Sequence, residues 1–254
     1  MHKLETQNIT MKFGDETIIR DISISVDPGE LVSLLGVSGS GKTTLFNCIS
    51  GIYTPVEGKV ILDGEDITGT TGHISYMLQK DLLLPYKTIE DNVALPLVIR
   101  GMSRSEARAQ ASAHFEAFGL AGTQKKYPKQ LSGGMRQRAA LLRTYLFSDN
   151  VALLDEPFSA LDTITKGKIH KWYLDVMEKI NLMTVFITHD INEAILLSDR
   201  IYIMAGKPGE IRSEIRITTP RTQRQEFDLT DEFMEYKRQI VSLLDEEKKE
   251  NESE

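Results

Sequence analysis

The order of hydrophobic and polar residues near the start of the chain indicates β structure. Ile22, Ile24 and Val26 alternate with polar residues, which is typical of a half-buried strand. Segments 57–67 and 200–217 are also β-like. Further runs are almost continuously apolar, as expected for strands covered on both faces: LVSLL (31–35), NVALLDEP (150–157) and MTVFITHD (183–190).

Helical spacing appears between these strands. Segment 43–52 suits a helix that ends near Gly51, and segment 133–147 suits a second helix. Ser103 stands three residues before Glu106, which is a capping-box pattern. Residues of one helical face follow it: Ala107, Ala111, Phe115 and Phe118. The region 88–148 is therefore predicted to be a helical subdomain inserted into an α/β core.

The chain is predicted to end in a packing helix and a charged tail. One face of this helix carries apolar residues at helical spacing: Leu229, Phe233, Tyr236, Ile240 and Leu243. Residues 246–254 are nearly all charged or polar, and we expect them to be disordered. The remaining residues, 1–245, are assigned to a single large domain.

The composition of the chain limits the kinds of molecule with which it is expected to interact. A formal net charge of -7 disfavours non-specific binding to nucleic acid or to anionic lipid, so no nucleic-acid partner is expected. The single cysteine, Cys48, excludes an internal disulfide and fits a core position in a reducing compartment. Neither a signal-peptide pattern nor an apolar run of roughly 18 residues occurs in the sequence. We therefore expect the chain to reach a membrane only by docking on another protein.

A glycine-rich loop follows the first apolar run. Its sequence, GVSGSGKTT, matches the P-loop pattern G-x-x-x-x-G-K-[ST]. The predicted nucleotide-binding residues are Gly36, Val37, Ser38, Gly39, Ser40, Gly41, Lys42, Thr43 and Thr44. Glycines let main-chain N–H groups wrap a triphosphate, and the N-terminus of the next helix attracts its charge.

Three side chains of this loop have distinct expected roles. Lys42 reaches the β- and γ-phosphates, the Thr43 hydroxyl binds Mg²⁺, and Thr44 hydrogen-bonds a phosphate. The alternative is a glycine-rich turn that binds nothing. The strand before the loop and the helix after it disfavour that alternative.

Two carboxylates end the apolar run at 150–157. Asp155 and Glu156 stand at the carboxyl end of the predicted strand, where ligands bind in open α/β sheets. We expect Asp155 to hold Mg²⁺ through its water shell, and Glu156 to orient and deprotonate the attacking water. The alternative is a pair of residues that only caps the strand.

The segment QLSGGMRQRAALLR (130–143) resembles the LSGGQ signature of ABC-type ATPase domains. Other elements of that family occur in the expected order: Gln79 as the Q-loop, SALD (159–162) as the D-loop and His189 as the switch histidine. The resemblance covers about Leu4 to Arg216. It implies an α/β fold with a P-loop NTPase core, an antiparallel β subdomain and an inserted helical subdomain, and it implies ATP and Mg²⁺ as ligands.

Ser132, Gly133 and Gly134 open the helix predicted for 133–147. A hydroxyl and a helix N-terminus together can bind an anion, and a loop that merely caps the helix is the alternative. In the family, this half-site does not meet the P-loop of its own chain. The resemblance therefore implies an isologous dimer in which each ATP lies between the P-loop of one copy and the signature of the other, with Asp162 also at the nucleotide.

Gln79 and His189 take their roles from the resemblance. Gln79 would contact Mg²⁺ or the water and transmit the nucleotide state to the helical subdomain, and His189 would contact the γ-phosphate and hold the water. With Glu156 they form the predicted catalytic set. Taken alone, Gln79 is compatible with a surface glutamine, and His189 with an ordinary residue at the end of a strand.

Two positions depart from the family pattern. Met135 replaces the usual glutamine of the signature, so a polar contact from that side chain to the opposite ribose is lost. Phe13 replaces the usual tyrosine that stacks on adenine, and stacking itself contributes about 1–3 kcal/mol by analogy with base–aromatic contacts. A phenylalanine in the hairpin core is the alternative for Phe13.

The chain carries neither the membrane helices of ABC exporters nor a second ATPase domain. It therefore resembles the separate ATP-binding subunit of a bacterial importer, peripheral on the cytoplasmic face of the membrane. In such importers two copies dock on integral membrane permease subunits, which an external solute-binding protein supplies. The expected docking residues are Leu82, Leu83, Leu84 and Tyr86, which alternatively belong to the core of the helical subdomain.

The segments LSGGMRQR and AGKPGEIRSEIRITTPRTQR resemble the nitrate/sulfonate/taurine importer subfamily, which includes importers of pyrimidine precursors of thiamine. The alternative function is a soluble ABC ATPase that remodels a cytoplasmic complex without a permease. A nucleotide-binding module without hydrolysis is disfavoured by Glu156.

Overall fold

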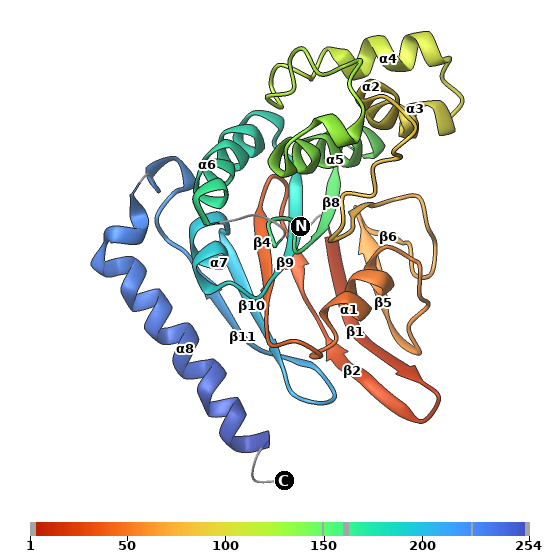
Figure 1. Ribbon diagram of the computed structural model, residues 1–254. Coiled ribbons are helices and arrows are strands. Elements are labelled where there is room, and N and C mark those ends of the chain that lie inside the picture. Colours follow the sequence, from red (N-terminus) through yellow and green to blue (C-terminus); the bar gives the residue numbers. More distant parts are fainter. Residues whose placement is uncertain (1–3, 149, 160–162, 225, 252–254) are drawn as a thin grey trace. The chain divides into compact units, whose positions relative to one another are not determined.

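The computed structural model describes residues 4–148, 150–159, 163–224 and 226–251 (Figure 1). The chain divides into two compact units. The first unit combines Met1–Ile74 with Met183–Glu254, and the second unit is the intervening segment Ser75–Leu182. The middle of the chain is thus an insertion in the sequence of the first unit.

An antiparallel sheet is built from the N-terminal part of the first unit. Its strand β1 (Leu4–Phe13) pairs with β2 (Glu16–Ile22), β3 (Ser25–Val26) and β5 (Glu57–Leu62), and β5 pairs with β6 (Glu65–Asp66). All these pairings are antiparallel. This sheet is the antiparallel β subdomain expected from the sequence.

The strand predicted through Ile22, Ile24 and Val26 is interrupted, although all three side chains are buried. β2 ends at Ile22 and β3 begins at Ser25. The reason is Thr6, whose hydroxyl donates to the Ile22 carbonyl over 3.1 Å and accepts from the Ile24 amide over 2.9 Å. These side-chain hydrogen bonds replace part of the ladder, which alternation in the sequence cannot indicate.

Buried parallel strands form the centre of the first unit. The strand β4 (Leu31–Leu35) lies between β9 (Met183–Thr188) and β10 (Arg200–Ala205) and is parallel to both. The strand β11 (Glu210–Arg216) pairs antiparallel with β10. Every residue of β4, β9 and β10 is buried, which explains the nearly continuous apolar sequence of these strands.

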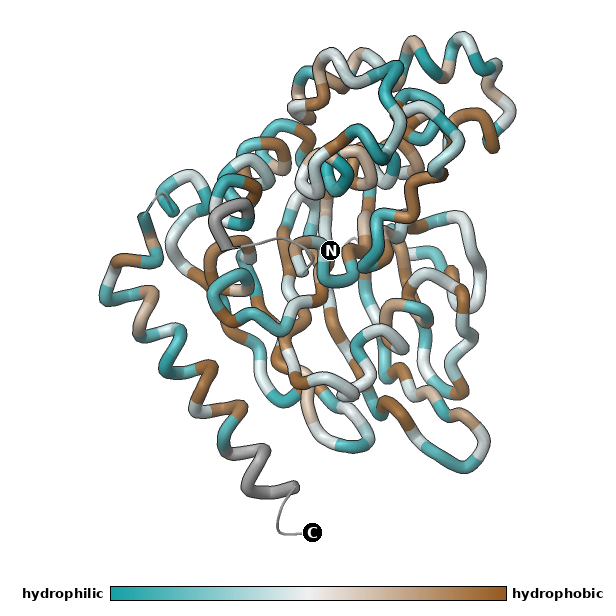
Figure 2. Tube along the Cα trace, viewed as in Figure 1, coloured by the Kyte–Doolittle hydropathy of each residue, from teal (hydrophilic) through white to brown (hydrophobic). Residues whose placement is uncertain are grey.

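The helix α8 (Asp231–Asn251) packs on the first unit. Phe233 and Ile240 are buried in a cluster with residues of α7 (Ile191–Leu197), β10 and β11, and Tyr236 packs against this cluster. Figure 2 shows hydrophobic residues recurring along the helix among hydrophilic ones. The C-terminal packing helix expected from the sequence is therefore present.

One expectation about this end of the chain is wrong. Leu229 is 79% exposed, because it lies in the short 3₁₀ turn η3 (Phe227–Leu229) and the helix begins only after Thr230. The backbone of α8 continues to Asn251, into the segment 246–254 for which the composition predicts disorder. Glutamate and lysine favour helix once a helix precedes them, and composition alone does not distinguish this case from disorder.

The second unit combines parallel strands with helices. Its strand β7 (Ser75–Met77) pairs in parallel with β8 (Val151–Asp155). Its helices are α2 (Ile89–Val93), α3 (Leu95–Ile99), α4 (Arg104–Ser112), α5 (Gly133–Phe147) and α6 (Thr163–Ile180).

The capping box at the start of α4 is present. Ser103 Oγ accepts the Glu106 amide, and the Glu106 carboxylate accepts the Ser103 amide, both over 3.3 Å. The helix ends at Ser112, so Phe115 and Phe118 lie beyond it, although both are fully buried as the sequence predicts. The sequence therefore predicts correctly which of these residues are buried, but the helix is shorter than the predicted face.

Candidate functional site

A tight glycine loop connects β4 to α1 (Lys42–Ile49) in the first unit. A Cβ atom on Gly36 would lie 2.1 Å from the carbonyl oxygen of Met204. Gly41 has φ of +90°, and a Cβ atom there would lie 2.4 Å from Cγ2 of Ile19. Only glycine fits these two positions, because backbone and side chains approach the loop this closely.

Lys42 lies within the curve of its own loop. Its ammonium donates to the carbonyl oxygens of Gly36 over 2.9 Å and of Val37 over 2.7 Å, and the residue is only 8% exposed. Val37, Ser38 and Gly39 are exposed. The loop therefore presents backbone to the solvent around a buried positive charge.

The first turn of α1 is open to an anion. Its N-cap residue, Gly41, has no side chain to cap the helix. Ser40 is buried, Thr43 is exposed and Thr44 is half-buried in the first turn. Helix N-terminal N–H groups without a side-chain cap, next to a lysine, suit a phosphate group.

His189 follows directly after β9 and is exposed. The next residue, Asp190, caps α7 by accepting the amides of Asn192 over 2.9 Å and Glu193 over 3.3 Å. In addition, the buried Thr188 hydroxyl donates to the Glu193 carboxylate over 2.7 Å. The backbone on both sides of His189 is thus fixed by hydrogen bonds, while the imidazole faces solvent.

Arg224 closes the other end of α7. Its Nη1 donates to the carbonyls of Ile195, Leu196 and Ser198, and the contact with Ser198 is 2.6 Å long. Burial lowers the pKa of Arg224 to about 10. A cation near the C-terminal carbonyls of a helix stabilises it, so the C-terminal segment holds the helix that follows His189.

Phe13 is 47% exposed, which excludes the hairpin-core alternative. Its ring meets that of Tyr53 edge to face, with centroids 5.4 Å apart and planes at 84°. Such a pair is favourable and orients the ring. The sequence drew attention to Phe13 alone, and Tyr53, which lies just after α1, was missed.

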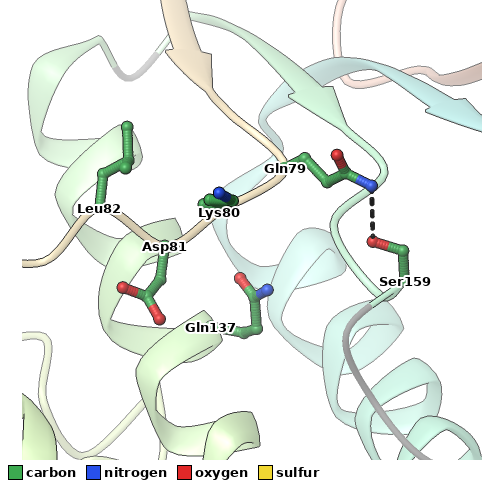
Figure 3. Close-up of a pocket in the computed structure, with 6 residues that line it drawn as sticks. All are labelled: Gln79, Lys80, Asp81, Leu82, Gln137 and Ser159. Carbon is green, nitrogen blue, oxygen red and sulfur yellow. Dashed lines mark hydrogen bonds between the residues drawn. The ribbon is translucent and has the colours of Figure 1, made fainter.

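The second unit brings together residues that follow its two parallel strands. Gln79 comes after β7, and its Nε2 donates to Glu156 Oε2 over 3.0 Å and to Ser159 Oγ over 3.4 Å (Figure 3 shows Gln79 and Ser159). Glu156 follows β8 directly and has φ of +45°. Asp155, the last residue of β8, is 9% exposed. The sequence placed these carboxylates at the end of the strand, and the contact with Gln79 joins residues 77 positions apart.

A cleft of about 590 Å³ opens beside Gln79. The residues that line it are Gln79, Lys80, Asp81, Leu82, Gln137 and Ser159 (Figure 3). Gln137 is 7% exposed, and its buried Oε1 has no hydrogen-bond partner among the described residues. An acceptor of this kind at the wall of a cleft can receive a donor from outside the chain.

The signature segment has the expected geometry. Gly133 and Gly134 open α5, and Ser132 is its exposed N-cap. Ser132 Oγ accepts the Met135 amide over 3.3 Å. The Ser132 hydroxyl therefore caps its own helix and lies at a solvent-facing N-terminus. This geometry is compatible both with a residue that only caps the helix and with one that binds an anion.

The leucines after Gln79 divide between core and surface. Leu83 is 7% exposed and belongs to the core of the second unit, whereas Leu82 is 51% and Tyr86 73% exposed. Leu84 is half-buried.

Cys48 is fully buried, and burial raises the pKa of its thiol to about 12, so it is a core residue as expected. Asp162 lies outside the described residues.

Among the residues that the structure describes, no cluster of three or more His, Cys, Asp or Glu side chains could hold a metal ion by itself. Mg²⁺ usually takes only one or two protein ligands and completes its shell with water and phosphate oxygens. The donor types at Thr43, Gln79 and Asp155 therefore fit Mg²⁺ that arrives with a nucleotide. Within the described part of the chain, no helix is both long and apolar enough to cross a membrane.

Residues 19–159 match the protein family described as ABC transporter. The chain is 42% identical over 234 residues to the formylaminopyrimidine import ATP-binding protein ThiZ of Halalkalibacterium halodurans, with 91% of each chain covered. It is 35% identical over 239 residues to the nitrate import ATP-binding protein NrtD of Synechocystis sp., covering 92% of this chain and 90% of that relative.

A solved structure shares the fold over most of the chain. It is the dimeric structure of a post-hydrolysis state of the ATP-binding cassette MJ0796 bound to ADP and Pi, with a TM-score of 0.70 and 31% identity. The alignment covers 85% of this chain and 100% of that one.

Proposed function

The chain belongs to the ABC transporter family of ATPases, and on this premise we propose that it is the ATP-hydrolysing subunit of an importer. As a member of this family it is an ATP hydrolase that works with Mg²⁺. The P-loop NTPase fold, with an antiparallel β subdomain and a helical insertion, is the one expected from the sequence.

The observation that carries the proposal is the exposed Ser132 at the start of α5 in a chain that also has a complete P-loop. In the P-loop, the backbone of residues 36–41 and the Lys42 ammonium bind the phosphates, and Thr44 adds a hydroxyl. Phe13, held by Tyr53, offers a face for stacking on the base. Thr43, Asp155 and Gln79 would hold Mg²⁺, which would supply positive charge to the phosphates.

Three residues carry the hydrolysis step. Glu156 is the general base that takes a proton from the attacking water, and Gln79 orients its carboxylate through the 3.0 Å hydrogen bond. His189, exposed on a backbone fixed by Asp190 and Thr188, contacts the γ-phosphate and holds the water. These roles remain a proposal that substitution tests.

Two copies of the chain are needed to complete each site. The P-loop of one copy and Ser132, Gly133 and Gly134 of the other would enclose each ATP, with Asp162 also contributing. The related MJ0796 cassette supports this assembly, because it is dimeric with ADP and Pi bound. ATP then joins the two copies and hydrolysis separates them, which is the motion that drives transport.

The proposed transport partner is a pair of integral membrane permease subunits, with this chain peripheral on the cytoplasmic face. Leu82 and Tyr86 are large exposed apolar residues, and Leu82 lines the cleft that also holds the unpaired acceptor of Gln137. Such a surface suits a protein segment that brings apolar contacts and one donor. A solute-binding protein would deliver the cargo, and the names of the relatives favour small solutes such as nitrate or a formylaminopyrimidine.

Co-purification with a candidate membrane permease tests this function. We expect the wild-type chain to be retained on the tagged permease, and Leu82→Glu with Tyr86→Glu to abolish retention while preserving ATPase activity in solution. Leu229→Glu, at a residue 79% exposed in the first unit, is the matched control and should bind normally. An active ATPase that no permease retains would instead favour a soluble ATPase that remodels a cytoplasmic complex.

A further inference from the structure

The signature helix α5 holds the segment after Gln79 through two arginines. Arg136 and Arg143 are seven residues apart, so they lie on the same face of the helix, two turns from one another. Arg136 Nε pairs with Asp81 Oδ2 at 3.1 Å. Arg143 donates to the Asp81 carbonyl over 2.6 Å and to the Leu82 carbonyl over 2.9 Å. Together the two arginines therefore hold Asp81 and Leu82.

These contacts fix an unusual backbone. Leu82 has φ of +44°, a left-handed conformation that residues with a branched side chain seldom adopt. Asp81 contributes from both of its carboxylate oxygens, since Oδ1 accepts the Leu83 amide over 3.0 Å while Oδ2 faces Arg136. The planar fork of Arg143 matches two successive carbonyl oxygens, which the single ammonium of a lysine cannot do.

The two ends of this arrangement are residues of the proposed ATP sites. At one end, Gln79 stands two residues before Asp81 and donates to Glu156. At the other end, Ser132 stands four residues before Arg136 and accepts the Arg136 amide at its carbonyl over 3.0 Å. A continuous series of hydrogen bonds and short chain segments within the second unit thus joins Ser132 to Gln79.

We propose that Arg136 and Arg143 form a clamp, defined as their contacts with Asp81 and Leu82, which makes Gln79 and Ser132 change position together. The consequence for catalysis rests on the proposed function: Ser132 serves ATP bound by the other copy, whereas Gln79 serves ATP bound by its own copy. The clamp then transmits the state of one ATP site to the other through α5. Arg136 and Arg143 are positioning residues, because they act through Gln79 and Ser132.

Hydrogen exchange on the free chain tests the clamp without ATP hydrolysis. Asp81→Asn removes the charge that Arg136 binds, and Arg143→Lys keeps the charge but lacks the fork. In both variants we expect amide exchange to rise about tenfold in residues 79–84 and also at residues 135–136, whose amides bond Ser132.

Two further variants make the result specific. Arg136→Lys can still pair with Asp81, so amide exchange in both segments should stay near the wild-type rate. Asp66→Asn makes the same chemical change as Asp81→Asn in β6 of the first unit and should leave both segments unchanged.

Two outcomes would overturn the proposal. In the first, Asp81→Asn and Arg143→Lys raise exchange at 79–84 alone while 135–136 stay at the wild-type rate. In the second, exchange also rises throughout α2 and α4, which would give the arginines a purely structural role. The exchange measurement uses the free chain without ATP, so it tests the clamp separately from the proposed function. The clamp can be disproved while ATP still lies between two copies, and the clamp can be confirmed even if ATP does not lie between two copies.

Discussion

Gln79 donates a hydrogen bond from Nε2 to Oε2 of Glu156 over 3.0 Å, across 77 positions of sequence. Glu156 itself is held at φ of +45°, a conformation that a residue with a side chain adopts only when its surroundings impose it. The same Gln79 amide reaches Ser159 Oγ over 3.4 Å, and Ser159 Oγ donates to the Glu156 carbonyl over 3.0 Å. The proposed base is therefore oriented by a small polar network.

Removing the donor of this network should slow hydrolysis with little effect on ATP affinity. Gln79→Ala leaves Glu156 without its orienting hydrogen bond, so we expect kcat to fall about tenfold to a hundredfold while KM changes little. Steady-state phosphate release measures both constants. Gln7→Ala is the matched control, since Gln7 makes a comparable contact with Glu5 on β1 over 3.3 Å. An unchanged kcat in Gln79→Ala would contradict the orienting role.

Neutralising the proposed base should separate binding from hydrolysis. Glu156→Gln keeps the size and an acceptor for Gln79 but cannot take a proton, so turnover should fall at least about a hundredfold. With ATP and Mg²⁺ the variant should accumulate as a dimer on size-exclusion chromatography. Glu65→Gln, in exposed β6, should behave as wild type. A monomeric elution of Glu156→Gln with bound ATP would count against the assignment.

Two glycine-to-alanine changes should have opposite effects on stability. In Gly36→Ala, the new methyl group would lie 2.1 Å from the Met204 carbonyl oxygen, which we expect to destabilise the chain by about 1–3 kcal/mol and to abolish ATP binding. Gly167→Ala, at an exposed position of α6, has no atom within 4 Å of the new Cβ and should stabilise by about 0.5–1 kcal/mol. Thermal unfolding checks both, and equal stability of the two variants would refute the close-approach argument.

Stability should depend on pH through Asp66. The Thr68 hydroxyl, then the Thr68 amide and the Lys59 ammonium, lower the pKa of Asp66 from 3.8 to about 2. A carboxylate whose pKa is lower in the folded chain stabilises it above the unfolded pKa, and this contribution disappears as the pH falls through the folded value.

The free energies of unfolding of wild type and Asp66→Asn should therefore differ by an amount that depends on pH. This difference in unfolding free energy should be constant above about pH 5 and shrink as the pH falls from about 4 to about 2. Urea denaturation at several pH values measures it. A difference that does not change over this range would show that Asp66 keeps an ordinary pKa.

Local sequence patterns predicted much of the fold, because their causes are local. The nearly apolar run at 31–35 became the fully buried β4, and Ser103 with Glu106 formed the expected capping box. The P-loop pattern likewise predicted the strand–loop–helix around Lys42. In each case burial or a hydrogen bond acts between residues close in the sequence.

What the sequence did not indicate depends on contacts between distant residues. Alternation predicted a continuous strand through Ile24, but the Thr6 hydroxyl interrupts it. The spacing of Leu229 fits the face of α8, yet the helix begins later and leaves it exposed. The hydrogen bond from Arg143 to the Asp81 carbonyl links positions 62 apart, and no pattern in either segment predicts it.

The central claim is that Lys42 of one copy and Ser132 of the other act on the same ATP. Lys42→Ala and Ser132→Arg should each abolish hydrolysis alone, because every site in either homodimer then lacks one half. When the two variants are mixed in equal amounts, half of the dimers are mixed and each has one intact site, so about a quarter of wild-type turnover should return. Turnover no greater than the sum of the two separate variants would contradict the account, since it would mean that each chain encloses its own ATP.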